Sequence, residues 1–250
     1  RSCSPAAASP KPEAENRHTH FREALAEVWE EPQARRFTIF VFVSMLAYSM
    51  QDLILEPFGG FAFGLTPGQS TALSGLQHSG VFAGMLLVAI AGHPRVGWGS
   101  LKAWTVGGCL ASAAALGALV LAGLFAPNWP LNQTVIALGF ANGAFAVAAI
   151  GTMMGLAGTG RQKREGVRMG LWGAAQAIAF GLGGFFGAVS ADAIRPFVSE
   201  PADAFTVVFA AEAMLFVYAA LLGLTAIADP ARPANESYDA AAAKHAAEPG

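Results

Sequence analysis

The sequence has few charged residues for its length. Only 13% of its 250 residues are Asp, Glu, Lys or Arg, about half the share found in soluble domains. A soluble fold of this size needs a polar surface that so few charges cannot supply, and the same composition excludes disordered chains, collagen and coiled coils. Hydrophobic residues make up 54% of the chain and gather in long runs. This pattern is typical of an integral membrane protein.

Other absences exclude further classes of protein. The net charge is −2, so we expect no nucleic-acid partner. The two cysteines, Cys3 and Cys109, lie in a polar tail and in an apolar run, and we expect no disulfide between them. The sequence contains no Ser/His/Asp set, no Cys/His pair and no cluster of metal ligands, and segment 158–168 lacks the GxxxxGK[ST] pattern of a phosphate-binding loop. We therefore expect neither an enzyme nor a metal site.

Six apolar segments of 22 to 25 residues dominate the rest of the chain. As helices they would be roughly 33–38 Å long, enough to cross a hydrocarbon core of ~30 Å. They lack the strict alternation of barrel strands, so we predict an all-α integral membrane protein. The predicted transmembrane helices are 37–58, 69–91, 103–125, 131–155, 169–190 and 204–228.

The flanking regions are more polar. Residues 1–36 are predicted to be a linker with a short amphipathic helix at 21–31, which ends before Pro32. Its apolar face can lie on the membrane surface or pack against the protein itself. Residues 229–250 form an Ala-rich polar tail that we expect to be disordered.

Basic residues are distributed unevenly between the two predicted sides of the membrane. Fourteen of the fifteen Lys and Arg residues lie in the N-terminal region, in segments 92–102 and 156–168, or in the C-terminal tail, and only Arg195 lies on the other side. By the positive-inside rule, we predict that both termini are cytoplasmic.

Polar residues inside the first predicted helix are the leading candidates for function, because a charged side chain at membrane depth costs ~2.5–3.5 kcal/mol on insertion scales. A polar stripe at four-residue spacing, beside Gln51, comprises Ser44, Tyr48, Asp52 and Glu56. Since Glu56 precedes Pro57, we expect the helix to loosen there and Glu56 to lie at the outer mouth. The alternative for both carboxylates is a structural role at a hydrogen-bonded helix end.

Polar residues also occur in the later predicted helices, where they can face one shared cavity. They are Thr71, Ser74, Gln77 and His78 in the second helix, and Asn142, Gln176 and Glu212 in the fourth, fifth and sixth. For His78 we consider three roles: a satisfied core residue, a hydrogen-bond donor to a neighbour, or a ligand of a metal such as the magnesium of a chlorin.

Small-residue pairs predict close helix contacts. The GxxxG pairs are Gly80 with Gly84, Gly151 with Gly155, and Gly183 with Gly187. We expect them to pack within one chain, with oligomerisation as the alternative.

The segment GTGRQKREGVR at 158–168 is the most charged part between the predicted spans. It can simply set the topology, or it can form a cytoplasmic docking surface. The docking residues would be Arg161, Lys163, Arg164 and Arg168.

Two long motifs resemble one family. The stretch QDLILEPFGG at 51–60, followed by FAFGLTPGQST, and the stretch GTMMGLAGTGRQKREGVRMGLWGAAQAIAFGLGGFFG at 151–187 are similar to the PucC/LhaA family. These proteins are major-facilitator-like membrane proteins of phototrophic bacteria, related to proposed bacteriochlorophyll carriers. The resemblance covers residues from about 21 to 228. Gln51, Asp52 and Glu56 coincide with the family's acidic motif, and segment 161–166 with its basic loop.

The resemblance implies a light-harvesting antenna assembly factor that delivers or handles bacteriochlorophyll and shepherds antenna polypeptides in the bacterial inner, or intracytoplasmic, membrane. Bacteriochlorophyll would then be a transient cofactor, and the partners would be antenna polypeptides, membrane lipid and pigment-synthesis enzymes. The residues we expect to bind pigment or partner are Gln51, Asp52, Glu56, His78 and Glu212.

The family has twelve spans in two six-helix halves, and we predict six spans here. The match is to the C-terminal half of a major facilitator superfamily fold. We therefore expect either a fragment or a chain whose N-terminal six-helix half is a separate partner.

Two other functions remain open at this point. One is a proton-coupled secondary transporter of a small solute or tetrapyrrole, with Asp52, Glu56 or Glu212 as proton sites. The other is a permanent structural subunit of a photosynthetic complex. The segment GHPRVG at 92–97 is only a degenerate form of the facilitator loop motif, which argues against ordinary solute transport.

Overall fold

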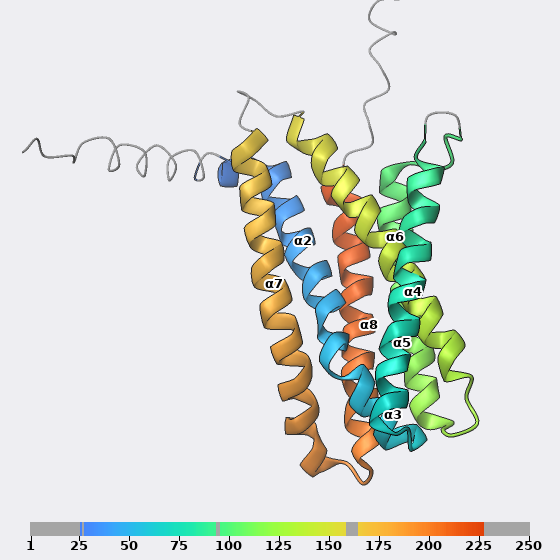
Figure 1. Ribbon diagram of the computed structural model, residues 1–250. Coiled ribbons are helices and arrows are strands. Elements are labelled where there is room, and N and C mark those ends of the chain that lie inside the picture. Colours follow the sequence, from blue (N-terminus) through green and yellow to red (C-terminus); the bar gives the residue numbers. More distant parts are fainter. Residues whose placement is uncertain (1–25, 27, 94–95, 159–164, 228–250) are drawn as a thin grey trace, which may run out of the picture.

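The computed structural model describes residue 26 and residues 28–93, 96–158 and 165–227, and this part of the chain is helical without β-strands. The all-α class predicted from the sequence is thus confirmed. The helices are α2 (Pro32–Met50), α3 (Leu55–Phe63), α4 (Pro67–Ala91), α5 (Leu101–Leu124), α6 (Leu131–Gly158), α7 (Glu165–Ile194) and α8 (Pro201–Ala226), with 3-10 turns at Gln51–Leu53 and Arg195–Phe197 (Figure 1).

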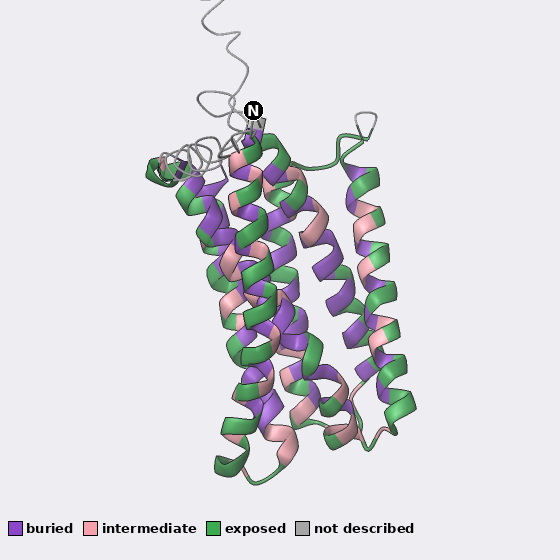
Figure 2. Ribbon diagram, turned by 60° about the vertical axis from the view of Figure 1, so that its left-hand side comes forward, coloured by how far each residue is buried: buried purple, intermediate pink, exposed green. Residues whose placement is uncertain are grey.

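The long helices have the dimensions of membrane spans. Five of those described, α4 to α8, are long and apolar enough to cross a membrane, and there are six if α2 and α3 form one span that is bent by 46°. Large apolar side chains on the outside of these helices remain exposed, as lipid-facing residues are, and the buried residues face the middle of the bundle (Figure 2). The chain is therefore a multi-pass membrane protein.

Successive spans run in opposite directions. As a result, the start of α2 and the end of α8 lie at the same end of the bundle, and α3 lies at the other end (Figure 1). The main contacts between spans form a series in the order α4, α6, α5, α8, α2 and α7. Helices α4 and α7 are thus the two ends of this series.

Glycines allow α4 and α6 to pack with their backbones in contact. A Cβ added at Gly80 or Gly84 of α4 would overlap a backbone carbonyl of α6, and a Cβ added at Gly139 or Gly143 of α6 would overlap one of α4. Any larger residue at these positions would therefore push the helices apart. The predicted pair Gly80 and Gly84 packs within the chain, as expected.

The second glycine contact joins α7 to α2. A Cβ at Gly183 would overlap the hydroxyl of Ser49, and one at Gly187 would overlap the carbonyl of Met50. This predicted pair also packs within the chain. The third pair does not make such a contact, since a Cβ at Gly155 would lie in open space.

The first predicted helix is broken. Helix α2 ends at Met50, a 3-10 turn follows, and α3 begins at Leu55. Pro57 explains the position of the break, because it has no N–H to donate to the carbonyl of Leu53 and its ring clashes with a helix that continues through that carbonyl. In α3 it lies in the first turn, where an N–H has no partner in any case. The expected loosening at Glu56 and Pro57 therefore lies earlier, at residues 51–54.

The region before α2 packs on the bundle in part. Residues 21–25 and 27 of the predicted amphipathic helix lie outside the described residues, but residues 28–30 are helical and Val28 is buried. Trp29, on the next position, is 44% exposed. Pro32 begins α2, so it separates the two helices as predicted.

Candidate functional site

The break in the first span places an amide inside the protein. The side chain of Gln51 is fully buried, and neither its oxygen nor its nitrogen has a hydrogen-bond partner among the described residues. Glu212, in the middle of α8, is also fully buried, and its two carboxylate oxygens likewise lack partners within the described part of the chain. The Glu212 carboxylate lies next to the backbone of Gln51 and near the carboxylate of Asp52. The break and α8 therefore enclose a buried polar centre.

Glu56 connects α3 to α4. Its carboxylate accepts hydrogen bonds from the hydroxyl of Ser74 at 2.7 Å and from that of Thr71 at 3.4 Å. Leu73 of α4 lies against Gly59 of α3, where even an added Cβ would be only 3.3 Å from its side chain. These contacts hold the short helix against its neighbour, which favours the structural role for Glu56.

A cavity of about 480 Å³ opens beside Glu56 at the α3 end of the bundle. It is lined by Glu56, Pro57, Gly60, Phe61, Leu65, Pro67, Ser70 and Thr71. Its wall is mostly apolar, with one carboxylate and two hydroxyls. This is the composition expected of a site that receives a largely apolar group with a few polar atoms.

Asp52 and His78 lie on the surface beside this polar centre. Both are exposed, and the Asp52 carboxylate is close enough to His78 for electrostatic attraction. The Nδ1 atom of His78 lies 2.8 Å from the backbone oxygen of Ser74. Ser74 therefore contacts Glu56 through its hydroxyl and His78 through its carbonyl. All five residues predicted to bind pigment or partner belong to one continuous region that extends from Glu56 through His78 and Asp52 to Gln51 and Glu212.

Ser44 and Asn142 lie outside this region, and Tyr48 lies at its edge, near the Asp52 carboxylate. Ser44 donates to the carbonyl of Phe40 in its own helix at 2.7 Å, and the amide oxygen of Asn142 accepts from Ser112 of α5, also at 2.7 Å. Tyr48 packs against the ring of Phe180 on α7, with 5.5 Å between ring centroids. The polar stripe expected along the first helix thus has different surroundings along its length: Ser44 bonds within α2, Tyr48 packs against α7, and Glu56 bonds to α4 beyond the break.

The predicted docking loop is only partly within the described chain. Arg161, Lys163 and Arg164 lie outside the described residues. Arg168 lies in the first turns of α7, is buried, and forms an ion pair with Glu31. Its Nη1 also lies 3.5 Å from the carbonyl oxygen of Ala157. Arg168 is thus buried and paired, which favours a structural role over the predicted docking role.

A metal ion held by protein side chains alone has no obvious place in the described residues. Within them, no group of three or more His, Cys, Asp or Glu side chains could hold one. What the region offers is one exposed imidazole, one exposed carboxylate and two buried polar side chains, with the mostly apolar cavity at its Glu56 end. Such a set can bind and orient a ligand.

Comparison with known proteins finds relatives along nearly the whole chain. The model of the PUCC protein family matches residues 4–229. The bacteriochlorophyll synthase 44.5 kDa chain of Rhodobacter capsulatus is 56% identical over 206 residues, which are 82% of this chain and 47% of the relative. An uncharacterized protein in the puhA-bchM intergenic region of the same species is 32% identical over 223 residues, or 85% of this chain and 45% of the relative. Protein PucC of that species is 28% identical over 208 residues, 81% of this chain and 44% of its own length. The chain spans about half the length of these curated relatives.

Proposed function

We propose, since this chain belongs to the PUCC protein family, that it assists the assembly of light-harvesting antenna complexes in the bacterial inner, or intracytoplasmic, membrane. In this role it handles bacteriochlorophyll and shepherds antenna polypeptides, and it binds rather than catalyses. The name of its 56% identical relative refers to bacteriochlorophyll, and the name PucC is shared by more distant relatives. The first name supports the pigment-handling part of this role.

The observation that carries the proposal is the polar region at the broken span. A break in a membrane helix is tolerated where the freed backbone is buried in protein or lines a cavity, and such breaks mark binding sites in membrane proteins. Here Gln51 and Ile54 of the break are buried in protein, and the short helix that follows carries Glu56 on the wall of the cavity. The region can therefore receive a partner from within the membrane.

The two carboxylates have different roles in this proposal. Glu56 already accepts two hydrogen bonds from α4, so it positions α3. Asp52 is exposed. A carboxylate accepts hydrogen bonds, and so do the carbonyl groups around a bacteriochlorophyll ring. Asp52 therefore cannot form a hydrogen bond with these carbonyl groups. Asp52 therefore suits a donor on an antenna polypeptide, such as a Trp or Tyr side chain.

We further propose that the bundle is the C-terminal half of a major facilitator fold, with both termini cytoplasmic. The chain spans 47% of its 56% identical relative, and α4 and α7 end the series of helix contacts.

The test of the assembly role uses Asp52→Asn in cells. We expect the variant to lower near-infrared antenna absorbance several-fold, while reaction-centre photochemistry stays normal and immunoblots show a normal amount of the protein. Asp192→Asn is a matched control, because Asp192 is also exposed but pairs with Arg195 at the α3 end of α7. Normal antenna levels in the Asp52 variant, or an equal loss in both variants, would contradict the proposal.

A second candidate function, proton-coupled transport, is favoured by one observation. Glu212 is fully buried in α8 without a hydrogen-bond partner in the described chain, and isolated carboxyls inside a membrane bundle often carry protons. Transport predicts that Glu212→Gln abolishes substrate-driven proton uptake in proteoliposomes. Assembly alone predicts no such uptake by the parent protein.

A further inference from the structure

The ring of His78 is held in a defined orientation. Its Nδ1 lies 2.8 Å from the backbone carbonyl oxygen of Ser74, one turn earlier in α4. Since a carbonyl oxygen only accepts hydrogen bonds, Nδ1 carries the hydrogen and donates it. In the neutral imidazole the lone pair then lies on Nε2. Histidines that bind metals almost always donate their other ring N–H to a carbonyl or carboxylate in this way, which fixes the ring and makes the ligand nitrogen more basic.

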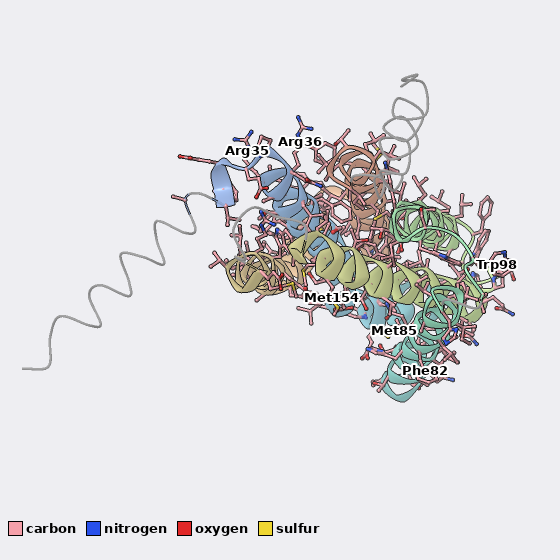
Figure 3. All side chains as sticks on the ribbon, turned by 90° about the horizontal axis from the view of Figure 1, so that it is seen from above. Arg35, Arg36, Phe82, Met85, Trp98 and Met154 are labelled. Atoms are coloured by element: carbon pink, nitrogen blue, oxygen red, sulfur yellow. The ribbon has the colours of Figure 1, made fainter. Side chains whose placement is uncertain are left out.

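The surface around His78 is open. His78 is exposed in the middle of α4, a helix that is apolar enough to span a membrane. Gly75, one turn earlier on the same face, has nothing within 4 Å of the place where a Cβ would be. Phe82, one turn later, is 68% exposed and lies on the outside of the bundle (Figure 3). Gly75 thus leaves room for a flat group over the helix, and Phe82 offers an aromatic ring for it to contact.

We propose that His78 binds the central magnesium of a bacteriochlorophyll-type tetrapyrrole through Nε2. The proposal rests on the pigment-handling function above and names the residue that holds the pigment. In such a pigment the macrocycle supplies four nitrogen ligands, so the protein needs to supply only one axial ligand. A single imidazole on an apolar face therefore suffices, although no cluster of three or more ligands is present in the described part of the chain.

His78 and Asp52 then have different roles in this region. His78 binds the metal of the pigment, and Asp52 accepts a hydrogen bond from the polypeptide that receives it. The two side chains are near enough to interact electrostatically. A pigment on His78 and a polypeptide on Asp52 would consequently lie side by side, as transfer from one to the other requires.

The test compares two pigments that differ only in the metal. The purified chain of residues 1–250 in detergent micelles is titrated with bacteriochlorophyll a and with bacteriopheophytin a, which has no magnesium. We expect the parent protein to bind bacteriochlorophyll more tightly. His78→Leu should weaken bacteriochlorophyll binding about tenfold or more, which corresponds to ~1.4 kcal/mol, and leave bacteriopheophytin binding unchanged. The visible absorption band that responds to axial ligation of magnesium gives a second readout.

Two further variants keep the result independent of folding. His78→Gly leaves a gap that added imidazole can fill, and we expect imidazole to restore the absorption band of ligated bacteriochlorophyll. His93→Leu, at the opposite end of α4 from Thr66, is the control and should change neither affinity.

Three results would overturn the ligand role: equal affinities of the parent protein for both pigments, an unchanged bacteriochlorophyll affinity in His78→Leu, or no rescue by imidazole. The first two would make His78 an electrostatic partner of Asp52. None of them contradicts the assembly function, which is tested separately by antenna absorbance in the Asp52→Asn cells.

Discussion

Polar groups are satisfied to different extents in two regions of the molecule, the contact between α4 and α6 and the break between α2 and α3. At the first, glycines bring two intact helices into backbone contact, and every backbone group inside the helices can bond within its own helix. At the second, the helix is interrupted and the side chains of Gln51 and Glu212 are buried without partners in the described chain. The difference indicates that one region supplies rigidity and the other keeps unused binding capacity.

The largest effect should come from the glycine contact. In Gly84→Ala the added methyl would overlap the backbone carbonyl of Phe140, which cannot move without shifting α6. Overpacking of this kind typically costs ~1–3 kcal/mol and sometimes more. The matched control is Gly107→Ala on α5, where the added methyl meets nothing within 4 Å. We expect this control to be neutral or to stabilise the helix by ~0.5–1 kcal/mol.

Thermal unfolding in detergent, followed by the reaction of the buried Cys109 thiol in a Cys3→Ser background, measures both glycine variants. A similar melting temperature for Gly84→Ala and the parent protein would show that the two helices can separate without cost, and the comparison between the regions would fail.

At the break we expect a substitution to change the stability in the opposite direction. Glu212→Met replaces a buried carboxyl, whose oxygens lie beside the Gln51 backbone but have no hydrogen-bond partner of good geometry in the described chain, by an apolar side chain of similar length. It should therefore raise the stability by ~1–3 kcal/mol. Asn142→Leu is the contrasting variant, because the Asn142 oxygen accepts a hydrogen bond from Ser112, whereas only its Nδ2 lacks a partner in the described chain. Its removal leaves a buried hydroxyl and should destabilise the protein. The same unfolding measurement applies. If Glu212→Met is as destabilising as Asn142→Leu, then Glu212 has a partner that holds the folded state together.

The sequence predicted the spans well because their signal is strong. Each of the five continuous spans, α4 to α8, begins and ends within four residues of its predicted bounds. The faces were harder to predict. Most of these helices are apolar on all sides, so periodicity does not distinguish the face that meets lipid from the face that meets protein. This explains why the sequence did not predict that Asp52 is exposed and Glu212 buried.

Two features depend on contacts that sequence spacing does not reveal. The break at residues 51–54 follows from Pro57 acting on the carbonyl of Leu53, four residues earlier, whereas we expected the effect on the residue directly before the proline. The ion pair between Arg168 and Glu31 joins residues 137 positions apart. A basic residue next to a charged loop is usually exposed, and only the tertiary packing of α7 against the segment before α2 buries this one.

The smallest change in stability is expected for Ser74→Ala, a variant that removes the contact of Ser74 with Glu56 but keeps its contact with His78. Ser74→Ala removes the hydroxyl that donates to Glu56 at 2.7 Å but keeps the backbone carbonyl that accepts from His78. A hydrogen bond to a charged group contributes ~1.5–3 kcal/mol, and since Ser74 is only partly buried we expect a loss of ~1 kcal/mol. The preference for bacteriochlorophyll over its metal-free form should not change, because the His78 ring keeps its acceptor.

Ser79→Ala is the control on the same helix. The Ser79 hydroxyl donates to the carbonyl of Leu76, which already accepts a hydrogen bond within the helix, so the loss of this hydroxyl should cost almost nothing. Detergent unfolding and pigment titration of the two variants decide the matter. An equal loss of stability in both would mean that Glu56 does not hold α3 in place. A change in pigment preference in Ser74→Ala alone would mean that α3 and the His78 surface act as one unit.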